Sequence, residues 1–203
     1  MNKRVIIIGA GGHGKVIADI VRQNGDIIVG FLDDAYDTEV DFYGTKILGK
    51  TDLYKSYVRD CQFVIAIGNN SIREKISGNL DVVWYTAIHP SAQISPSATI
   101  GEGTVVMPNA VINADAIIGC HCIINTGSVV EHDCEIGDFT HISPRAVVCG
   151  VTKIGKSCWV GAGSTITQVI NICNNVTVGA GGVVVRDIDH PGAYAGVPTK
   201  KIK

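Results

Sequence analysis

"VINADAIIGCHCIINTGSVVEHDCEIGDFTHI", residues 111–142, carries Ile or Val at every sixth position. The same register continues in both directions along the chain. Counting in sixes from residue 88 gives Ile88, Ile94, Ile100, Val106, Ile112, Ile118, Ile124, Val130, Ile136, Ile142, Val148, Ile154, Val160, Ile166, Ile172, Val178 and Val184. Chance does not produce such a run, because Ile and Val are a minority of the residues in an ordinary chain. The period therefore reflects a repeated structural unit.

A second, weaker pattern accompanies the aliphatic one. Ala, Ser, Thr or Cys stands four residues after each aliphatic position from residue 92 to residue 164, and glycines at 101, 119, 137 and 155 recur every eighteen residues. A six-residue unit whose landmarks return at eighteen predicts a three-sided coil of short strands, with both marked residues facing inward. We predict a left-handed parallel β-helix of hexapeptide repeats over residues 86–203. The period is lost after residue 190, where the tail is expected to fold over the last coil.

The first part of the chain follows a different rhythm, in which strand-like and helix-like segments alternate. Strands are expected at 4–8, 26–34 and 62–70, and helices at 13–25, 51–60 and 71–80, with Gly25, Thr51 and Ser71 at helix ends. This alternation predicts a small parallel sheet with helical crossovers, a Rossmann-like α/β domain. The expected domains are therefore residues 1–85 and residues 86–203.

The first predicted strand runs into a glycine-rich turn that fits two phosphate-binding templates. Gly9, Gly11 and Gly14 match the dinucleotide pattern G-x-G-x-x-G. Gly9, Gly14 and Lys15 match a P-loop, but Val16 stands where that loop needs a hydroxyl for Mg²⁺. A nicotinamide-dependent oxidoreductase would rest on the first match alone, because no second catalytic domain supports it.

Composition excludes several classes of partner. A formal net charge of −2 gives no reason to expect nucleic acid or an anionic membrane surface. No apolar run is long enough for a membrane span or a secretory signal, so a cytoplasmic protein is expected. Seven cysteines without paired CxxC spacing indicate reduced thiols, and Cys122, Cys134 and Cys158 fall at small inward positions.

The three residues Glu131, His132 and Asp133 combine an imidazole with two carboxylates. His132 is the second residue after inward Val130, which places it towards a corner of the prism. A histidine accepts a proton near neutral pH, and a neighbouring carboxylate stabilises the imidazolium that forms. A general base at this corner is the functional interpretation; a solvated polar corner is the alternative.

The chain resembles a known family in both of its parts. The motifs are "GAGGHGK" at 9–15, "FLDD" at 31–34, "AIGNN" at 66–70, "VVEHDCEIGDFTHIS" at 129–143 and "YAGVP" at 194–198. Together they resemble the bacterial sugar-nucleotide N-acetyltransferases of the bacillosamine type and their relatives, the sialic acid O-acetyltransferases. The prism alone is shared by many acyltransferases, and its combination with this N-terminal domain is much more specific.

The resemblance implies an acetyl-CoA-dependent N-acetyltransferase for a UDP-4-amino-4,6-dideoxy sugar in bacterial glycan synthesis. It implies a homotrimer with active sites between subunits, and no metal. Carried over by motif, the residues that contact the sugar nucleotide are Gly11, Gly12, His13 and Gly68, and those that contact the uridine are Asp33 and Asp34. The resemblance makes His132 the general base and Asp133 the carboxylate that supports it. The residues that it places in contact with acetyl-CoA are His141, Ala162 and Ala180. Family members usually carry Glu where this chain has Asp133.

Three alternatives to N-acetylation remain open at this point. The first is O-acetylation of a sugar such as sialic acid by the same machinery. The second is an inter-subunit zinc site built from His121, His132 and His141, although their spacing does not place them on one face. The third is a non-enzymatic trimer that senses nucleotide sugars. For the phosphates of CoA, the candidate cations are Lys153, Lys156, Lys200, Lys201 and Lys203.

Overall fold

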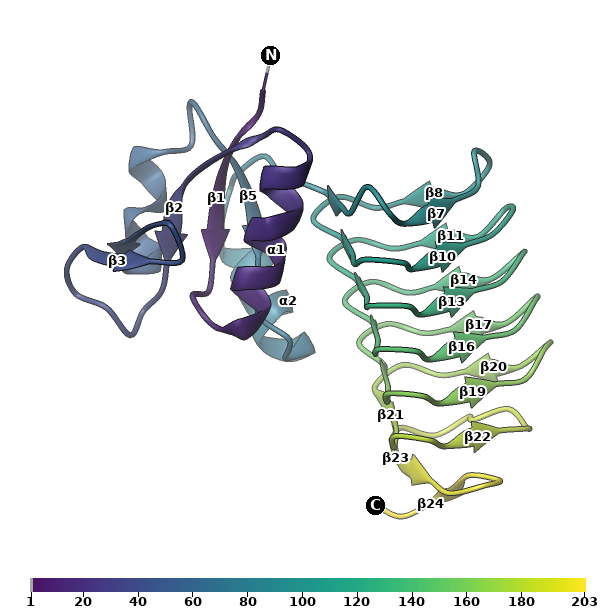
Figure 1. The fold of residues 1–203 in the computed structure, drawn as a ribbon. Helices are drawn as coiled ribbons and strands as arrows, with labels where there is room; N and C mark the ends of the chain where they lie inside the picture. The colour runs from purple at the N-terminus through teal and green to yellow at the C-terminus, as the bar shows by residue number, and fades with distance from the viewer. Residues whose placement is uncertain (1) are drawn as a thin grey trace. The chain divides into compact units, whose positions relative to one another are not determined.

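A computed structural model describes residues 2–203 of the chain. The chain divides into two compact units, Met1–Pro90 and Ser91–Lys203 (Figure 1). The division falls after Pro90, whereas the repeat places the start of the prism after residue 85; the short strand β6 (Ala87–Ile88) lies between these two positions. The predicted α/β part and the predicted left-handed parallel β-helix are both confirmed.

The first unit is a five-stranded sheet with helices packed on it. Its strand order is β3-β4-β2-β1-β5, and β1, β2, β4 and β5 are parallel. The elements are β1 (Arg4–Ile8), α1 (Gly12–Gln23), β2 (Ile27–Leu32), β3 (Val40–Phe42), β4 (Thr45–Gly49), the 3₁₀ helix η1 (Thr51–Ser56), β5 (Gln62–Ile65) and α2 (Asn70–Asn79). Helix α1 packs on β1 and β2, and α2 packs on β5. Strand β1 is buried on both faces, as the continuous run "VIII" indicates.

Two local predictions for this unit are wrong. The segment from 51 to 60 forms only a short 3₁₀ helix over Thr51–Ser56, and Thr51 does not cap it. The second concerns the start of α2. The Asn69 side chain, rather than that of Ser71, caps this helix by accepting a hydrogen bond from the Ile72 N–H. The edge hairpin of β3 and β4 has no counterpart in the prediction, because its strands are short and its outer residues are exposed.

The second unit is a prism of three ladders, each named here by its first strand within Ser91–Lys203, and parallel except for the last strand, β24. The β7 face contains β7 (Gln93–Ile94), β10 (Val111–Ile112), β13 (Val129–Val130), β16 (Val147–Val148), β19 (Thr165–Ile166) and β22 (Val183–Val184). The β8 face contains β8 (Thr99–Ile100), β11 (Ile117–Ile118), β14 (Glu135–Ile136), β17 (Lys153–Ile154) and β20 (Asn171–Ile172). The β9 face contains β9 (Val105–Val106), β12 (Ile123–Ile124), β15 (His141–Ile142), β18 (Trp159–Val160), β21 (Val176–Val178), β23 (Gly192–Ala195) and β24 (Lys200–Lys201).

Register between coils is fixed at eighteen residues, as predicted. Val111 pairs with Val129 and Val129 pairs with Val147, and the other two faces repeat the same offset. The second residue of each two-residue strand up to β22 faces inward, as Val178 does in the three-residue β21, and these aliphatic residues are buried from Val106 to Val184. The coils stack visibly along the unit in Figure 1. One continuous hydrophobic core therefore runs through the prism.

Most small polar residues inside the prism bond to the backbone of the next coil, whereas the Ser128 hydroxyl donates to the Asn125 carbonyl on its own coil. Thr104 and Thr140 donate their hydroxyls to the carbonyls of Gly119 and Gly155, at 2.8 Å in each case. The Cys134 thiol donates to the Cys149 carbonyl at 3.2 Å. Such bonds remove the cost of burying a hydroxyl or thiol, so the small inward position accepts Thr and Cys as well as Ala.

The C-terminal tail folds onto the last coil, as predicted. Strand β23 extends the β9 face in parallel with β21, and β24 pairs with β23 antiparallel. None of the helices in residues 2–203 is long and apolar enough to cross a membrane.

Strand β11 offers a direct test of the inward register. Ile118 is 2% exposed, while its neighbour Ile117 is 52% exposed. Ile118→Ala leaves a cavity between two coils and should lower the free energy of unfolding by about 2–5 kcal/mol. Ile117→Ala should change it by less than about 0.5 kcal/mol. Urea unfolding of the two variants checks this, and equal losses would contradict the register.

Candidate functional site

A cavity of about 650 Å³ opens in the first unit where β1, β2 and β5 end. It lies outside the carboxyl ends of parallel strands, the usual ligand position in such sheets. The structure brings all six predicted substrate-binding residues into its lining: Gly11, Gly12, His13, Asp33, Asp34 and Gly68. The sequence reasoning missed several further lining residues from η1 and α2, namely Thr51, Ile72, Lys75, Ile76 and Asn79.

The glycines of the first turn divide into two kinds. Gly9 has φ +106°, and a Cβ on Gly14 would lie 2.4 Å from the Gly9 carbonyl oxygen, so these two glycines shape the turn itself. A Cβ on Gly11 or Gly12 would meet nothing within 4 Å. No side chain caps the N-terminus of α1 at Gly11. The first N–H groups of this helix are thus free to bind an anion in the cavity.

Asp33 and Asp34 fix the loops around the cavity. Asp33 accepts hydrogen bonds from the Ala10 N–H at 2.8 Å and the Ala35 N–H at 3.0 Å. Asp34 accepts one from the Thr51 N–H at 2.8 Å, and this bond lowers the pKa of the Asp34 carboxyl. Both carboxylates are therefore rigidly held at the cavity wall before any ligand arrives.

His13 is a neutral side chain in the cavity wall. Its Nε2 is buried and makes no hydrogen bond within residues 2–203. Burial, and then the positive charge of Arg73, lower the pKa of His13 to about 4. Arg73 itself is buried and donates to the carbonyls of Ile67 and Gly68 at 3.0 and 3.1 Å. Arg73 thereby positions the loop of Gly68, a role that its place in a predicted helix did not reveal.

A second site lies on the prism, at the corner between β13 and β14. His132 is exposed there, and its Nδ1 lies 2.8 Å from Asp133 Oδ2. The hydrogen bond to Asp133 raises the pKa of His132, and the charges of Asp133 and Glu131 act in the same direction. The shorter carboxylate of this chain therefore reaches the ring. Asp133 adopts φ +57°, a conformation that Asp tolerates better than most residues.

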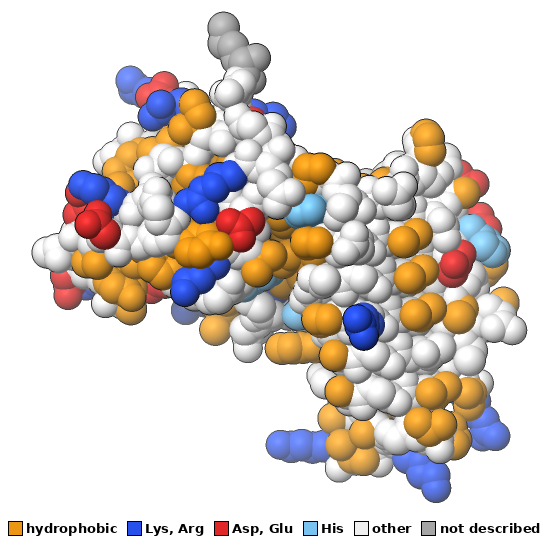
Figure 2. Space-filling model, viewed as in Figure 1, with side chains coloured by type: hydrophobic (Ala, Val, Ile, Leu, Met, Phe, Trp, Pro, Cys, Tyr) orange, Lys and Arg blue, Asp and Glu red, His pale blue; other side chains and the backbone are white. Residues whose placement is uncertain are grey.

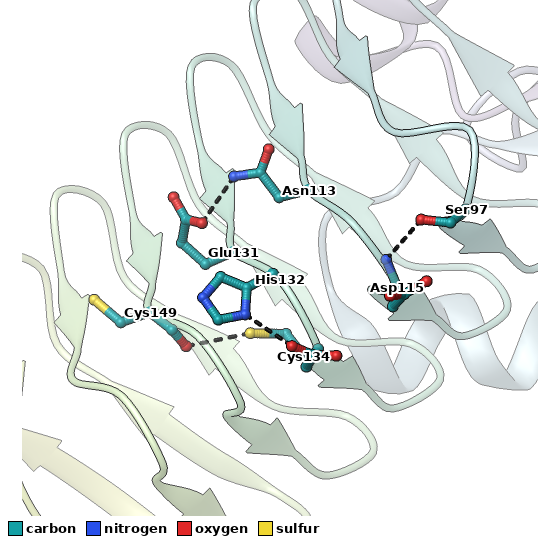
Figure 3. A network of polar contacts seen from close by, with 8 residues as sticks. Ser97, Asn113, Asp115, Glu131, His132, Cys134 and Cys149 are labelled. Atoms are coloured by element: carbon teal, nitrogen blue, oxygen red, sulfur yellow. Dashed lines mark hydrogen bonds and ion pairs between the residues drawn. The ribbon is translucent and has the colours of Figure 1, made fainter.

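Glu131 occupies the same corner, on the side nearer the preceding coil. The Asn113 Nδ2 donates to Glu131 Oε2 at 2.8 Å, from one coil to the next (Figure 3). Cys149 follows Glu131 on the next coil, since Val129 and Val147 are register partners. Figure 3 shows the side chains of Glu131, His132 and Cys134 at this one corner, with the His132 ring drawn between the other two.

Gly150 provides the space in which the His132 ring lies. It occupies the equivalent corner position one coil further on and is buried. A Cβ added there would lie 2.7 Å from both Cε1 and Nε2 of His132. The backbone of Gly150 is not in the left-handed region, so the requirement for glycine at this position comes from the ring alone. Sequence reasoning did not identify Gly150, because its contact spans two coils.

The predicted acetyl-CoA residues lie elsewhere on the prism. His141 is buried on the outer side of β15, with Nε2 2.9 Å from Asn125 Nδ2 and its ring centroid 5.1 Å from that of Trp159. Ala162 and Ala180 are exposed and follow β18 and β21 on this β9 face. Within one chain, the structure therefore does not bring His141 together with the His132 corner.

The other histidines and lysines named from the sequence are placed as follows. His121 is buried at a different corner, stacked on Phe139 with ring centroids 5.2 Å apart. Lys153 pairs with Glu135 at 2.7 Å, and Lys156 lies over the Phe139 ring. Lys200 and Lys201 are exposed, and Figure 2 shows cationic side chains gathered at the C-terminal end of this unit. His121, His132 and His141 do not share a face.

Comparison with known proteins identifies both parts of the chain. Residues 4–80 match the PglD N-terminal domain, and residues 115–150 match the bacterial transferase hexapeptide (six repeats). UDP-N-acetylbacillosamine N-acetyltransferase of Bacillus subtilis (strain 168) is 42% identical over 110 residues, which are 51% of this chain and 50% of that protein. The chain thus matches about half the length of this curated relative.

Two solved structures resemble the chain over nearly its whole length. The acetyltransferase domain of PglB from Neisseria gonorrhoeae FA1090, in complex with acetyl coenzyme A, is 38% identical, with a TM-score of 0.92 and 100% of both chains covered. PerB from Caulobacter crescentus, in complex with CoA and GDP-perosamine, is 35% identical, with a TM-score of 0.93, covering 98% of this chain and 97% of that one. The chain belongs to the bacterial sugar-nucleotide N-acetyltransferase family that joins a PglD N-terminal domain to a hexapeptide prism.

The contact between the His132 ring and Gly150 can be tested without any substrate. Gly150→Ala should force the ring away from Asp133 and bring the pKa of His132 back towards its ordinary value. The free energy of unfolding should change by less than about 1 kcal/mol, because an exposed side chain can move aside. NMR titration of the imidazole checks the first point. Gly78→Ala, whose Cβ meets nothing within 4 Å, is the matched control; an unchanged His132 titration in Gly150→Ala would contradict the contact.

Proposed function

We propose that the chain transfers the acetyl group of acetyl-CoA to the 4-amino group of a UDP-4-amino-4,6-dideoxy-N-acetylhexosamine. The observation that carries the proposal is the exposed His132–Asp133 pair at a prism corner, in a chain whose other unit holds a nucleotide-sized cavity. Family membership supports transfer to a sugar-nucleotide amine. The Bacillus relative is named for a UDP-sugar, and the Caulobacter structure holds a GDP-sugar. The family therefore uses more than one nucleotide, and the choice of uridine is made by this proposal.

The cavity suits the diphosphate of a nucleotide sugar. The pyrophosphate would lie at the uncapped N-terminus of α1, over Gly11 and Gly12, where added side chains would otherwise occupy the space. Neutral His13 would offer a hydrogen bond through its unpartnered Nε2, and Lys75 supplies a positive charge in the lining. The fixed carboxylates of Asp33 and Asp34 would receive the nucleoside.

Acetyl transfer at the prism follows from the His132–Asp133 geometry. The unprotonated amine attacks the thioester carbonyl carbon, and the C–S bond breaks as the tetrahedral intermediate collapses. Nε2 of His132 takes the proton that the nitrogen loses and passes it to the departing thiolate, which leaves as CoA-SH. Asp133 holds Nδ1 and stabilises the imidazolium between these two transfers.

The acetyl donor is proposed to lie between two chains of a homotrimer. His141, Ala162 and Ala180 lie on the β9 face, away from the His132 corner of the same chain, so a site that uses all of them needs a second chain. The outer side of the β7 face carries the half-buried residues Val111, Val129, Val147 and Val183, an apolar surface suited to packing between chains. Hydrophobic side chains recur along the visible side of the prism in Figure 2. Lys200 and Lys201 are candidates for the phosphates of CoA.

Loss of the base should remove most of the activity. We expect His132→Ala to lower kcat for thiol release from acetyl-CoA by about 100-fold or more, because general-base catalysis contributes that much. The assay uses a panel of UDP-, GDP- and CMP-linked amino and hydroxy sugars. Glu135→Gln, an exposed carboxylate on the β8 face, is the control and should keep wild-type activity. If only hydroxyl acceptors were turned over, the proposed N-acetylation would be wrong and O-acetylation would take its place. If His132→Ala kept full activity, His132 would not be the general base.

The pH dependence of kcat should reveal whether Asp133 acts on His132. Because Asp133 raises the pKa of His132, the neutral imidazole predominates only above a raised value, and the acidic limb of kcat lies correspondingly high. Asp133→Asn should move this limb to lower pH and reduce the plateau by about tenfold or more, since the imidazolium loses its partner. A pH profile of kcat at saturating acceptor measures both effects. A limb that stays in place would show that Asp133 does not act on His132.

A further inference from the structure

The His132 corner carries one more carboxylate than the base requires. Asp133 alone contacts Nδ1 of His132, and Glu131 is held separately by the Asn113 amide at 2.8 Å. Only Oε2 of Glu131 accepts this bond; its other oxygen makes no hydrogen bond to residues 2–203. Glu131 is half-buried, so its position is restrained while one oxygen remains available. Figure 3 shows this carboxylate on the Asn113 side of the His132 ring.

The proposed reaction releases one proton more than His132 transfers when the acceptor binds as an ammonium ion. A sugar amine resembles an α-amino group, whose pKa is about 7.7–8.0, so much of it is ammonium at neutral pH. Ammonium plus acetyl-CoA gives amide, CoA-SH and one free proton. A hydroxyl acceptor gives ester and CoA-SH with no free proton. In either case His132 carries one proton from the attacking atom, nitrogen or oxygen, to sulfur. The ammonium acceptor leaves one more proton to be removed.

We propose that Glu131, held by Asn113, binds the ammonium form of the acceptor and takes its first proton, and so selects an amine over a hydroxyl. The N–H bond of the ammonium breaks, the proton moves to the free carboxylate oxygen of Glu131 and then to solvent, and the neutral amine attacks. A carboxylate–ammonium contact is a charge-assisted hydrogen bond, which a hydroxyl acceptor cannot form with the same strength. The inference rests on the proposed acetyl transfer at His132.

The groups around Glu131 are engaged or neutral, so Glu131 is the carboxylate available to accept the proton of the ammonium. On its own corner stand His132 and Asp133, which are bonded to each other. On the preceding coil the neighbour is the neutral Asn113. On the next coil stands Cys149, and the Cys134 thiol is engaged with the Cys149 carbonyl. Burial raises the pKa of Cys134, so this thiol stays neutral.

A purely electrostatic role for Glu131 predicts the opposite pH effect. The charge of Glu131 raises the pKa of His132, so a neutral residue at 131 would leave more unprotonated imidazole at low pH. If that were the whole role, Glu131→Gln would gain relative activity as the pH falls. Loss of ammonium binding instead makes the variant lose relative activity as the pH falls, because the ammonium form then predominates.

The test is a steady-state comparison of wild type, Glu131→Gln and Asn113→Ala between pH 6 and pH 9, with a UDP-4-amino sugar and its 4-hydroxy counterpart. We expect Glu131→Gln to raise KM for the amine about 10- to 100-fold at pH 6.5. The deficit should shrink towards pH 9, and hydroxyl acceptors should show no loss at low pH. Asn113→Ala should show a smaller deficit of the same sign. Glu135→Gln is the control.

Three outcomes overturn the inference: a deficit that does not depend on pH, a relative gain at low pH, or an equal loss for both acceptors. Failure of the proposed function has a different signature, since wild type would then release no thiol with any amine. Circular dichroism of each variant at both pH limits confirms that the prism is folded, so that a loss of activity is read as a loss of Glu131 chemistry.

Discussion

Stacking of one inward Ile or Val on the equivalent residue of the next coil is the constraint on which the prism depends. Each coil of the prism has eighteen residues, and strands of successive coils pair at that offset. An extra residue within a strand would shift this register and turn aliphatic side chains outward. Every corner residue consequently lies directly above its counterpart in the next coil. Asn113, Glu131 and Cys149 form one such column, and His132 and Gly150 belong to the adjacent one.

This stacking explains how an exposed corner can hold a precise arrangement. His132 is exposed, and an exposed side chain is ordinarily mobile. The Asp133 carboxylate nevertheless holds one side of its ring, and the backbone of Gly150 lies against it. Backbone hydrogen bonds between coils hold these positions, for example from the Val151 N–H to the His132 carbonyl at 3.0 Å. Rigid backbone therefore positions the His132 side chain, as burial does for side chains in a core.

The two units also use charge in opposite ways. The cavity of the first unit relies on a helix N-terminus, a neutral His13 and carboxylates already bonded to backbone, so it suits a rigid anionic ligand. The prism corner concentrates carboxylates around one imidazole, so it suits protons and cations.

Much of this was predictable from the sequence, and the exceptions share a physical cause. Inward residues and the corner position of His132 follow from the period, because a six-residue repeat leaves each residue one orientation. The six cavity residues come from the family resemblance, through motifs that stand at the ends of predicted strands. Contacts between distant segments do not follow: Arg73 is a charge inside a helix whose partners are carbonyls of the preceding loop, and Gly150 contacts a ring from the coil before it. The β3–β4 hairpin was missed because its short edge strands carry little pattern.

The most direct test of the central claim is to follow the acetyl group itself. Acetyl-CoA labelled with ¹³C at the carbonyl is mixed with the protein and a UDP-4-amino-4,6-dideoxy sugar, and ¹³C NMR identifies the product. The account predicts that the thioester signal is replaced by an amide carbonyl on the sugar, at a rate that depends on an unprotonated His132. Label that remains in the thioester, or that appears as an ester or free acetate, would contradict it.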